Sequence, residues 1–272
     1  MFGKDAHSIS NQLTSIVWDD AIFRTVNEAR RLNTESPSDK KGFNTDLMRL
    51  FDKGFVISQA MAIRRLTDPN FSSPDKAVIS LVRLLDDLEE NLHLITRENY
   101  ISYDGSRFEM EARSPIDNEF FHWEQRQEYF DRLSSVSAQD RNRKDLICPQ
   151  LFKESRMELG ACADFRVLAN KFFAHAAEAS PKRNTIEKEK KITLNNFDQA
   201  YKALIKVSSF ISIAILYEHS LGAVLVPQYD HLENLEKPMI LQEEFKSLGE
   251  FWDKRVKEVE DWNSNIWPNS RR

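Results

Sequence analysis

The stretch Ala169–Ala177, ANKFFAHAA, decides how this chain is interpreted, because it places His175 in the middle of what reads as a packed helix. Asn170 and Lys171 precede the histidine by about one turn, and a phenylalanine lies on each of two faces. Residues four apart share a face of an α-helix, so Lys171 and His175 are expected to be neighbours. Two interpretations follow: His175 is an acid/base group acting on a charged substrate, or it is a polar residue in a helical core.

The surroundings of His175 are compatible with either interpretation. Imidazole gives and takes protons near neutral pH, and a nearby ammonium group favours its neutral form and attracts phosphate. The small residues Ala174 and Ala176 allow a second helix or a ligand to approach closely. Periodicity alone favours the structural interpretation, because a single histidine in a helix is more often bonded to a neighbour than catalytic.

Helical spacing continues on both sides of this stretch and predicts an all-α protein. The chain is rich in Leu, Glu, Lys, Arg and Ala and has only 7 Gly and 9 Pro residues, which favours helices over strands. The helix that contains His175 is expected to begin at Pro149 and to end before Pro181. Apolar spacing and turn signals predict further helices at about 10–32, 44–67, 77–95, 118–133, 194–220 and 241–262.

Several boundaries have recognisable local signals. Asn44 and Thr193 are expected N-caps, and Ser73 followed by Pro74 is expected to open the third helix. Asp104-Gly105 predicts a tight turn. We expect one domain over residues 1–272, with a core at about 44–222, an additional N-terminal helix and a C-terminal helical extension at 239–265.

Composition narrows the class of protein. The net charge is −5, which disfavours non-specific wrapping of nucleic acid by the whole surface but leaves room for a local basic site. Two cysteines, Cys148 and Cys162, fit a reduced, cytoplasmic setting better than a disulfide framework. The N-terminus has no apolar run typical of a signal peptide, and the apolar stretch at 207–217 is too short to cross a membrane. We expect a soluble protein with no membrane partner.

The motif helix resembles a known family. DFRVLANKFFAHAAE, with N-K-x-x-A-H on a late helix, resembles the signature of HEPN proteins, specifically those of abortive-infection type. The upstream segments FDKGFVISQAMAIRRLTDP and VISLVRLLDDLEENLHLITRENY resemble the helices that precede that motif. The resemblance covers about residues 47–221. It implies an up-and-down helical bundle, a homodimer with a composite cleft, and RNA cleavage without metal or cofactor.

The resemblance also implies roles for individual residues. His175 matches the acid/base histidine that acts in attack by the RNA 2′-hydroxyl, and Asn170 matches the polar residue that often follows the family's arginine. That arginine is missing, because Ala169 stands where it is expected. The nearest upstream arginine, Arg166, is nine residues before His175 and would point to the opposite face of a regular helix.

Several residues are candidates to replace the missing charge. Lys171 lacks the bidentate fork of a guanidinium, and Arg166 is the arginine closest in sequence. Arg64, Arg65 and Arg97 are candidate substrate-binding residues from other helices, and a dimer mate is a further source. Arg64 and Arg65 are equally compatible with solvated charges at a helix end.

Other groups of residues in the sequence give weaker evidence of a functional site. Glu90/His93 and Glu119/His122 have the spacing of di-iron carboxylate sites, but chance matches to such a short motif are expected. Thirteen helical residues separate Cys162 from His175, about 20 Å, so Cys162 is expected to be a core residue rather than a nucleophile. The apolar stripe with Trp252, Trp262 and Trp267 is more typical of core than of a partner surface. We expect no metal site and no cofactor.

Two hypotheses therefore stand. The first is a metal-independent RNA-cleaving HEPN-type protein of an antiphage, abortive-infection or toxin–antitoxin system, with transfer RNA as one candidate substrate. The second is a non-catalytic HEPN-like bundle that binds RNA or a partner protein, such as an antitoxin or another protein of a defence system. The retained N-K-x-x-A-H favours the first, and Ala169 favours the second.

Overall fold

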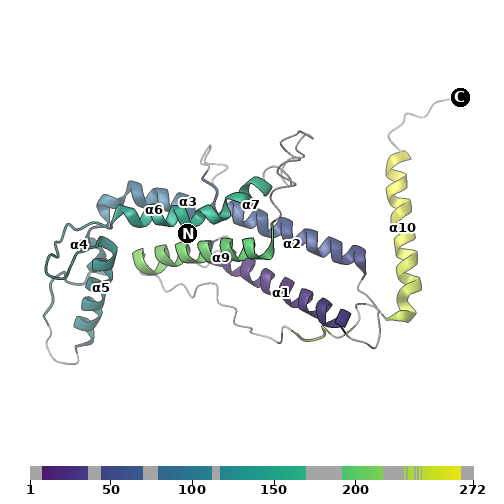
Figure 1. The fold of residues 1–272 in the computed structure, drawn as a ribbon, viewed down its shortest axis with the longest axis horizontal. Coiled ribbons are helices and arrows are strands. Elements are labelled where there is room, and N and C mark those ends of the chain that lie inside the picture. Colours follow the sequence, from purple (N-terminus) through teal and green to yellow (C-terminus); the bar gives the residue numbers. More distant parts are fainter. Residues whose placement is uncertain are drawn as a thin grey trace. The chain divides into compact units, whose positions relative to one another are not determined.

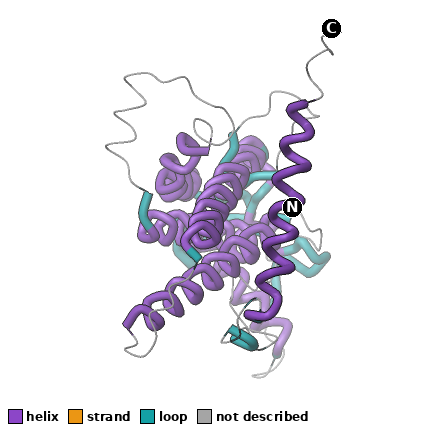
Figure 2. Tube along the Cα trace, turned by 90° about the vertical axis from the view of Figure 1, so that its right-hand side faces the viewer, coloured by secondary structure: helices purple, strands orange, loops and turns teal. Residues whose placement is uncertain are grey.

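The chain divides into two compact units, Met1–Leu225 and Val226–Arg272. The computed structural model describes residues 8–35, 44–69, 79–111, 117–169, 192–216, 230, 232–235, 237, 239 and 241–264. The boundary between the two units, at residue 225, lies close to the expected end of the core near residue 222, and the expected single domain stays a prediction. Within the described ranges the elements of secondary structure are helices joined by loops and turns, and no strand is present (Figure 2). The predicted all-α helical bundle is confirmed.

The first unit is built from helices of very different length (Figure 1). Its described elements are α1 (Ile9–Glu35), α2 (Thr45–Leu66), α3 (Leu81–Glu90), the 3-10 turn η2 (Leu92–Leu94), α4 (Arg97–Ile101), α5 (Asn118–Ser134), α6 (Pro149–Leu159), the 3-10 turn η3 (Gly160–Cys162), α7 (Ala163–Leu168), α9 (Leu194–Ser209) and the π-helical turn η5 (Phe210–Ile215). An isolated antiparallel bridge joins Thr96 to Leu146.

Local capping explains where several of these helices begin. The side chain of Asn44 accepts a hydrogen bond from the Leu47 N–H, and Thr193 forms a reciprocal capping box with Asn196. These side chains satisfy N–H groups that the first turn leaves without partners. Both predicted caps are confirmed. The third helix differs, because it begins at Leu81 with Ser80 as its cap; the predicted start at Ser73 lies outside the described residues.

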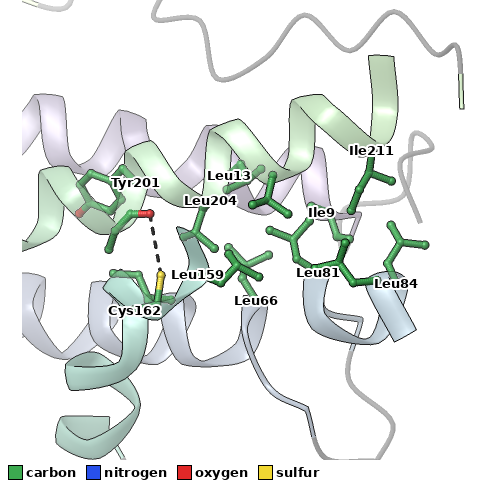
Figure 3. Close-up of a cluster of buried hydrophobic side chains, with 14 of the residues drawn as sticks. Ile9, Leu13, Leu66, Leu81, Leu84, Leu159, Cys162, Tyr201, Leu204 and Ile211 are labelled. Atoms are coloured by element: carbon green, nitrogen blue, oxygen red, sulfur yellow. Dashed lines mark hydrogen bonds between the residues drawn. The ribbon is translucent and has the colours of Figure 1, made fainter. Parts of the chain in front are cut away.

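The core of the first unit forms where α1, α2 and α9 pack together with α7. Figure 3 shows aliphatic side chains from these helices and from α3 and α6 interdigitating, among them Leu13, Leu66, Leu81, Leu159 and Leu204. Because α1 supplies Ile9, Leu13, Ile16 and Phe23 to this core, it is an integral helix and not an addition to a core that starts at residue 44.

A series of aromatic contacts crosses the same core. The rings of Phe23 and Phe55 stack with centroids 3.7 Å apart, and Phe55 contacts Phe197 at 5.5 Å. Phe197 in turn contacts Phe165 of α7 at 4.7 Å. The last two pairs are tilted, a geometry that stabilises packing beyond the area that the rings bury. The contacts fix α7, which carries the first residues of the motif DFRVLANKFFAHAAE, between α2 and α9.

The second unit contains a 3-10 turn, η6 (Gln242–Glu244), and the helix α10 (Phe245–Ser264). Its apolar stripe was expected to be core, but the large side chains are exposed: Trp252 is 68% exposed and Trp262 is 58% exposed. These values describe the second unit by itself, Trp267 lies outside the described residues, and the core role of the stripe stays a prediction. None of the described helices combines the length and apolar composition needed to span a lipid bilayer.

Candidate functional site

The candidate site begins at the C-terminal end of α2, where two arginines occupy the last turn. Arg64 is partly buried and lies 3.9 Å from the Asp68 carboxylate, whereas Arg65 is exposed. Positive charge at this position is favourable because helix C-termini carry partial negative charge. Thr67 caps the helix: its N–H reaches the carbonyls of Ile63 and Arg64, and its hydroxyl donates to Ile63 at 2.9 Å.

α7 packs against this end of α2 and brings a third arginine to it. Nη1 of Arg166 donates to the backbone carbonyl of Thr67 at 3.4 Å, a bond that links residues 99 positions apart in sequence. Arg64, Arg65 and Arg166 therefore lie at one corner of the first unit, which we call the α2–α7 corner. Sequence reasoning selected these arginines but missed Thr67, whose backbone oxygen gave no signal in the side-chain pattern.

The other face of α7 is committed to the core. Phe165 is 1% exposed and packs against α9, and the Cys162 thiol faces the Ala200 carbonyl at 3.9 Å (Figure 3). Burial raises the pKa of the Cys162 thiol to about 12, and the charge of Arg166 acts in the opposite direction. A thiol with so high a pKa is not a nucleophile near neutral pH. The predicted core role of Cys162 is confirmed.

Ala169 stands where the family motif calls for arginine, and it is fully buried, with 0% exposure. A guanidinium would not fit there without moving its neighbours. The helix is also irregular: η3 interrupts it before α7, and Ala169 itself is π-helical. The regular rotation of about 100° per residue, which put Arg166 on the face opposite His175, does not apply through Ala169. Asn170, Lys171 and His175 lie outside the described residues.

Arg97 lies in the interior, away from this corner. Its side chain is 0% exposed, and its guanidinium forms ion pairs with Asp131 at 2.7 Å and Asp145 at 2.8 Å. Burial tends to raise the pKa of Asp131, but hydrogen bonds from Arg141 and Arg97 hold it below its ordinary value. The assignment of Arg97 to substrate binding is therefore corrected, because a fully buried and paired guanidinium has no surface to offer a phosphate. It ties α4 to α5 instead.

The paired Glu-x-x-His motifs do not form a metal centre among the residues that the structure describes. Within those ranges, no group of three or more His, Cys, Asp or Glu side chains is arranged to hold a metal ion. Glu90 ends α3 and His93 lies in η2, whereas Glu119 and His122 lie on α5 and line a pocket beside the α4–α5 connection. The sequence analysis treated this pair as a chance match and did not connect it with the Asp104-Gly105 turn, which the structure places in the same pocket.

Comparison of the chain with family models, with curated proteins and with solved structures gives no match. The functional assignment accordingly depends on the motif and on the geometry of the α2–α7 corner.

Proposed function

We propose that this chain is a HEPN-type protein that cleaves RNA without a metal ion, within an antiphage, abortive-infection or toxin–antitoxin system. The observation that carries the proposal is the position of Arg166: it is bonded to the end of α2, beside Arg64 and Arg65, four residues before the start of N-K-x-x-A-H. Clustered guanidinium groups are suited to holding a phosphodiester, since each presents several donors in a fixed plane.

The reaction assigned to this site is an intramolecular transesterification. His175 accepts the proton of the RNA 2′-hydroxyl, the 2′-oxygen attacks the adjacent phosphorus, and the bond from phosphorus to the 5′-oxygen breaks. The leaving oxygen takes up a proton, which gives a 5′-hydroxyl end and a 2′,3′-cyclic phosphate. Arg166 and Arg64 stabilise the charge that develops on the phosphoryl oxygens, and Lys171 and Asn170 assist. A homodimer, with a composite cleft, and action in the cytoplasm are parts of the same proposal.

The buried position of Ala169 favours a second candidate function. A chain that cannot accommodate the family's arginine at that point is suited to binding RNA, or a partner such as an antitoxin, without cleaving it. The two candidate functions use the same α2–α7 corner to bind RNA or a partner, and they differ only in whether the RNA backbone is cleaved.

The test compares the purified wild type with His175→Ala on transfer RNA and total RNA in EDTA, scoring fragments and their end groups. Cleavage by the wild type alone, with 2′,3′-cyclic phosphate ends, supports the nuclease. RNA binding by both proteins without cleavage by either favours the binding module. Cleavage that persists in His175→Ala contradicts the assigned role of this histidine.

A further inference from the structure

A polar pocket of about 580 Å³ lies between the α4–α5 connection and the first half of α5. Its lining includes Tyr103, Asp104 and Arg107 from the connection and Glu119, His122 and Arg126 from α5. The volume is within the range typical of small-molecule sites. In Figure 1, α4 and α5 lie toward one end of the first unit and α7 lies nearer its middle, so the pocket is separate from the α2–α7 corner.

The pocket wall on the side of the connection is held in place by specific bonds. Gly105 adopts a left-handed conformation, with φ of 83°, and closes a turn onto the Ser102 carbonyl. The Ser106 hydroxyl donates to the Ile101 carbonyl at 3.0 Å, and the indole N–H of Trp123 donates to the Phe108 carbonyl at 2.8 Å. These bonds hold the described part of the connection that lines the pocket, residues 102–108, against α4 and α5.

Arg126 supplies a cation that the pocket only partly neutralises. Its side chain is 9% exposed, and Nη1 pairs with Asp104 at 2.8 Å. Its Nε is buried and finds no hydrogen-bond acceptor among the described residues. Its guanidinium carbon lies 5.9 Å from the ring centroid of Tyr103, in cation–π contact. Buried donors are normally satisfied, so this arginine points to an additional acceptor or to a small rearrangement on ligand binding.

Three other side chains that line the pocket can each bind a different part of a ligand. The Tyr103 side chain is 60% exposed and offers an aromatic surface, Glu119 offers an exposed carboxylate, and Arg107 offers an exposed guanidinium. A simple anion is poorly matched, because Asp104 and Glu119 oppose it. An apolar ligand would displace water from Glu119 and Arg107 without replacing their hydrogen bonds. A nucleotide matches all three, since its base stacks, its polar edge donates hydrogen bonds, and its phosphate is anionic.

We propose that this pocket binds a single nucleotide unit, with the base stacked on Tyr103, the edge of the base bonded to Glu119 and the phosphate held by Arg107. The choice of single-stranded RNA as the source of that nucleotide rests on the function proposed above. The pocket then serves as a second RNA contact, separate from the α2–α7 corner.

The test measures binding, not cleavage, by the full chain carrying His175→Ala in EDTA. The probe is a fluorescein-labelled single-stranded RNA 12-mer, followed by fluorescence anisotropy and by competition with GMP, CMP, AMP, UMP and inorganic phosphate. Loss of one stacked base is expected to weaken binding about 5- to 150-fold in Tyr103→Ala. Tyr103→Phe is expected to retain binding, and Tyr129→Ala is the matched control, since Tyr129 lies on α5 and does not line the pocket.

The outcomes separate this inference from the nuclease proposal. Dependence of RNA binding on Tyr103 supports the pocket even where the wild type cleaves nothing. Tyr103-dependent binding of a mononucleotide itself, followed by isothermal titration calorimetry, in a chain that does not bind the RNA probe supports a nucleotide site and contradicts RNA as the source. RNA affinity and mononucleotide competition both unchanged in Tyr103→Ala overturn the inference, whether or not the chain cleaves RNA. Inorganic phosphate competing as well as every nucleotide shows an anion site only and overturns it too.

Discussion

Arg166 donates from Nη1 to the backbone carbonyl of Thr67, 3.4 Å away, and thereby ties α7 to the last turn of α2. Because Arg166 is only partly buried, the rest of its guanidinium remains able to meet a phosphate at the α2–α7 corner. The bond also places Arg166, a candidate phosphate-binding residue, in direct contact with the C-terminal end of α2, the helix that carries Arg64 and Arg65.

We expect Arg166→Ala to lower RNA cleavage about 100- to 1000-fold, the loss associated with removing one electrostatic stabiliser of a transition state. The free energy of unfolding should fall by no more than about 1.5 kcal/mol, the contribution of a single hydrogen bond. Initial cleavage rates and urea denaturation measure the two effects. Arg49→Ala is the control, since Arg49 lies at the other end of α2 and its side chain is 74% exposed. Equal rates for the two variants would contradict the role of Arg166.

Arg65→Ala tests whether the exposed guanidinium contacts RNA. Removing one phosphate contact to a single strand should reduce the slope of log K against log salt concentration by about 0.7 and weaken binding to all RNA sequences alike. Anisotropy titrations at several salt concentrations measure this slope. A slope identical to that of the wild type means that Arg65 is an ordinary solvated charge, the alternative that its position at a helix end left open.

Arg97→Ala is expected to destabilise the first unit by about 3–5 kcal/mol, because it leaves Asp131 and Asp145 without their buried partner. Arg143→Ala is the matched control: its side chain is 49% exposed and pairs with Glu98 and Glu109, and solvent screens exposed ion pairs, so its loss should cost far less stability than the loss of Arg97. Urea denaturation of both variants gives the comparison. Similar losses from the two substitutions would show that the interior pair contributes no more than a surface pair.

Because the Cys162 thiol is buried, we expect the chain to lose stability at alkaline pH. Burial raises the pKa of this thiol from 9.0 to about 12 in the folded chain. The contribution of the buried thiol to the free energy of unfolding is therefore complete below pH 9 and is lost as the pH rises toward 12. Between pH 9 and 10 the slope is at most about 1.4 kcal/mol per pH unit. The buried Tyr201 hydroxyl, whose pKa is also raised above its ordinary value of 10.0, lowers stability in the same direction as the pH approaches and passes 10, so the thiol's share is the difference between wild type and Cys162→Ala.

Denaturation of wild type and Cys162→Ala at pH 8, 9 and 10 measures this slope, which the substitution should reduce. A thiol reagent at neutral pH offers an independent check, since Cys162 is buried and Cys148 is partly exposed. One thiol should react rapidly in the folded chain and both in denaturant. Rapid reaction of both thiols in the folded chain would contradict the burial of Cys162.

The sequence by itself determined those features that depend on residues a few positions apart. Asn44 and Thr193 cap their helices because a cap requires only a side chain and an N–H three residues later. Pro149 begins α6 because its ring suits the first helical turn. The all-α class follows in the same way from helical spacing of apolar residues. The motif N-K-x-x-A-H is likewise a local pattern.

Only the tertiary structure decided which distant segments meet. Arg97 resembled a surface cation until Asp131 and Asp145, 34 and 48 residues away, were found around it. Tyr103 and Arg126 carried no sequence signal, because the turn at Gly105 and the helix α5 form a pocket only when folded together. Arg166 and Thr67 meet across 99 residues for the same reason. Periodicity reports which face of a helix is apolar, whereas the partner of that face depends on packing between segments far apart in sequence.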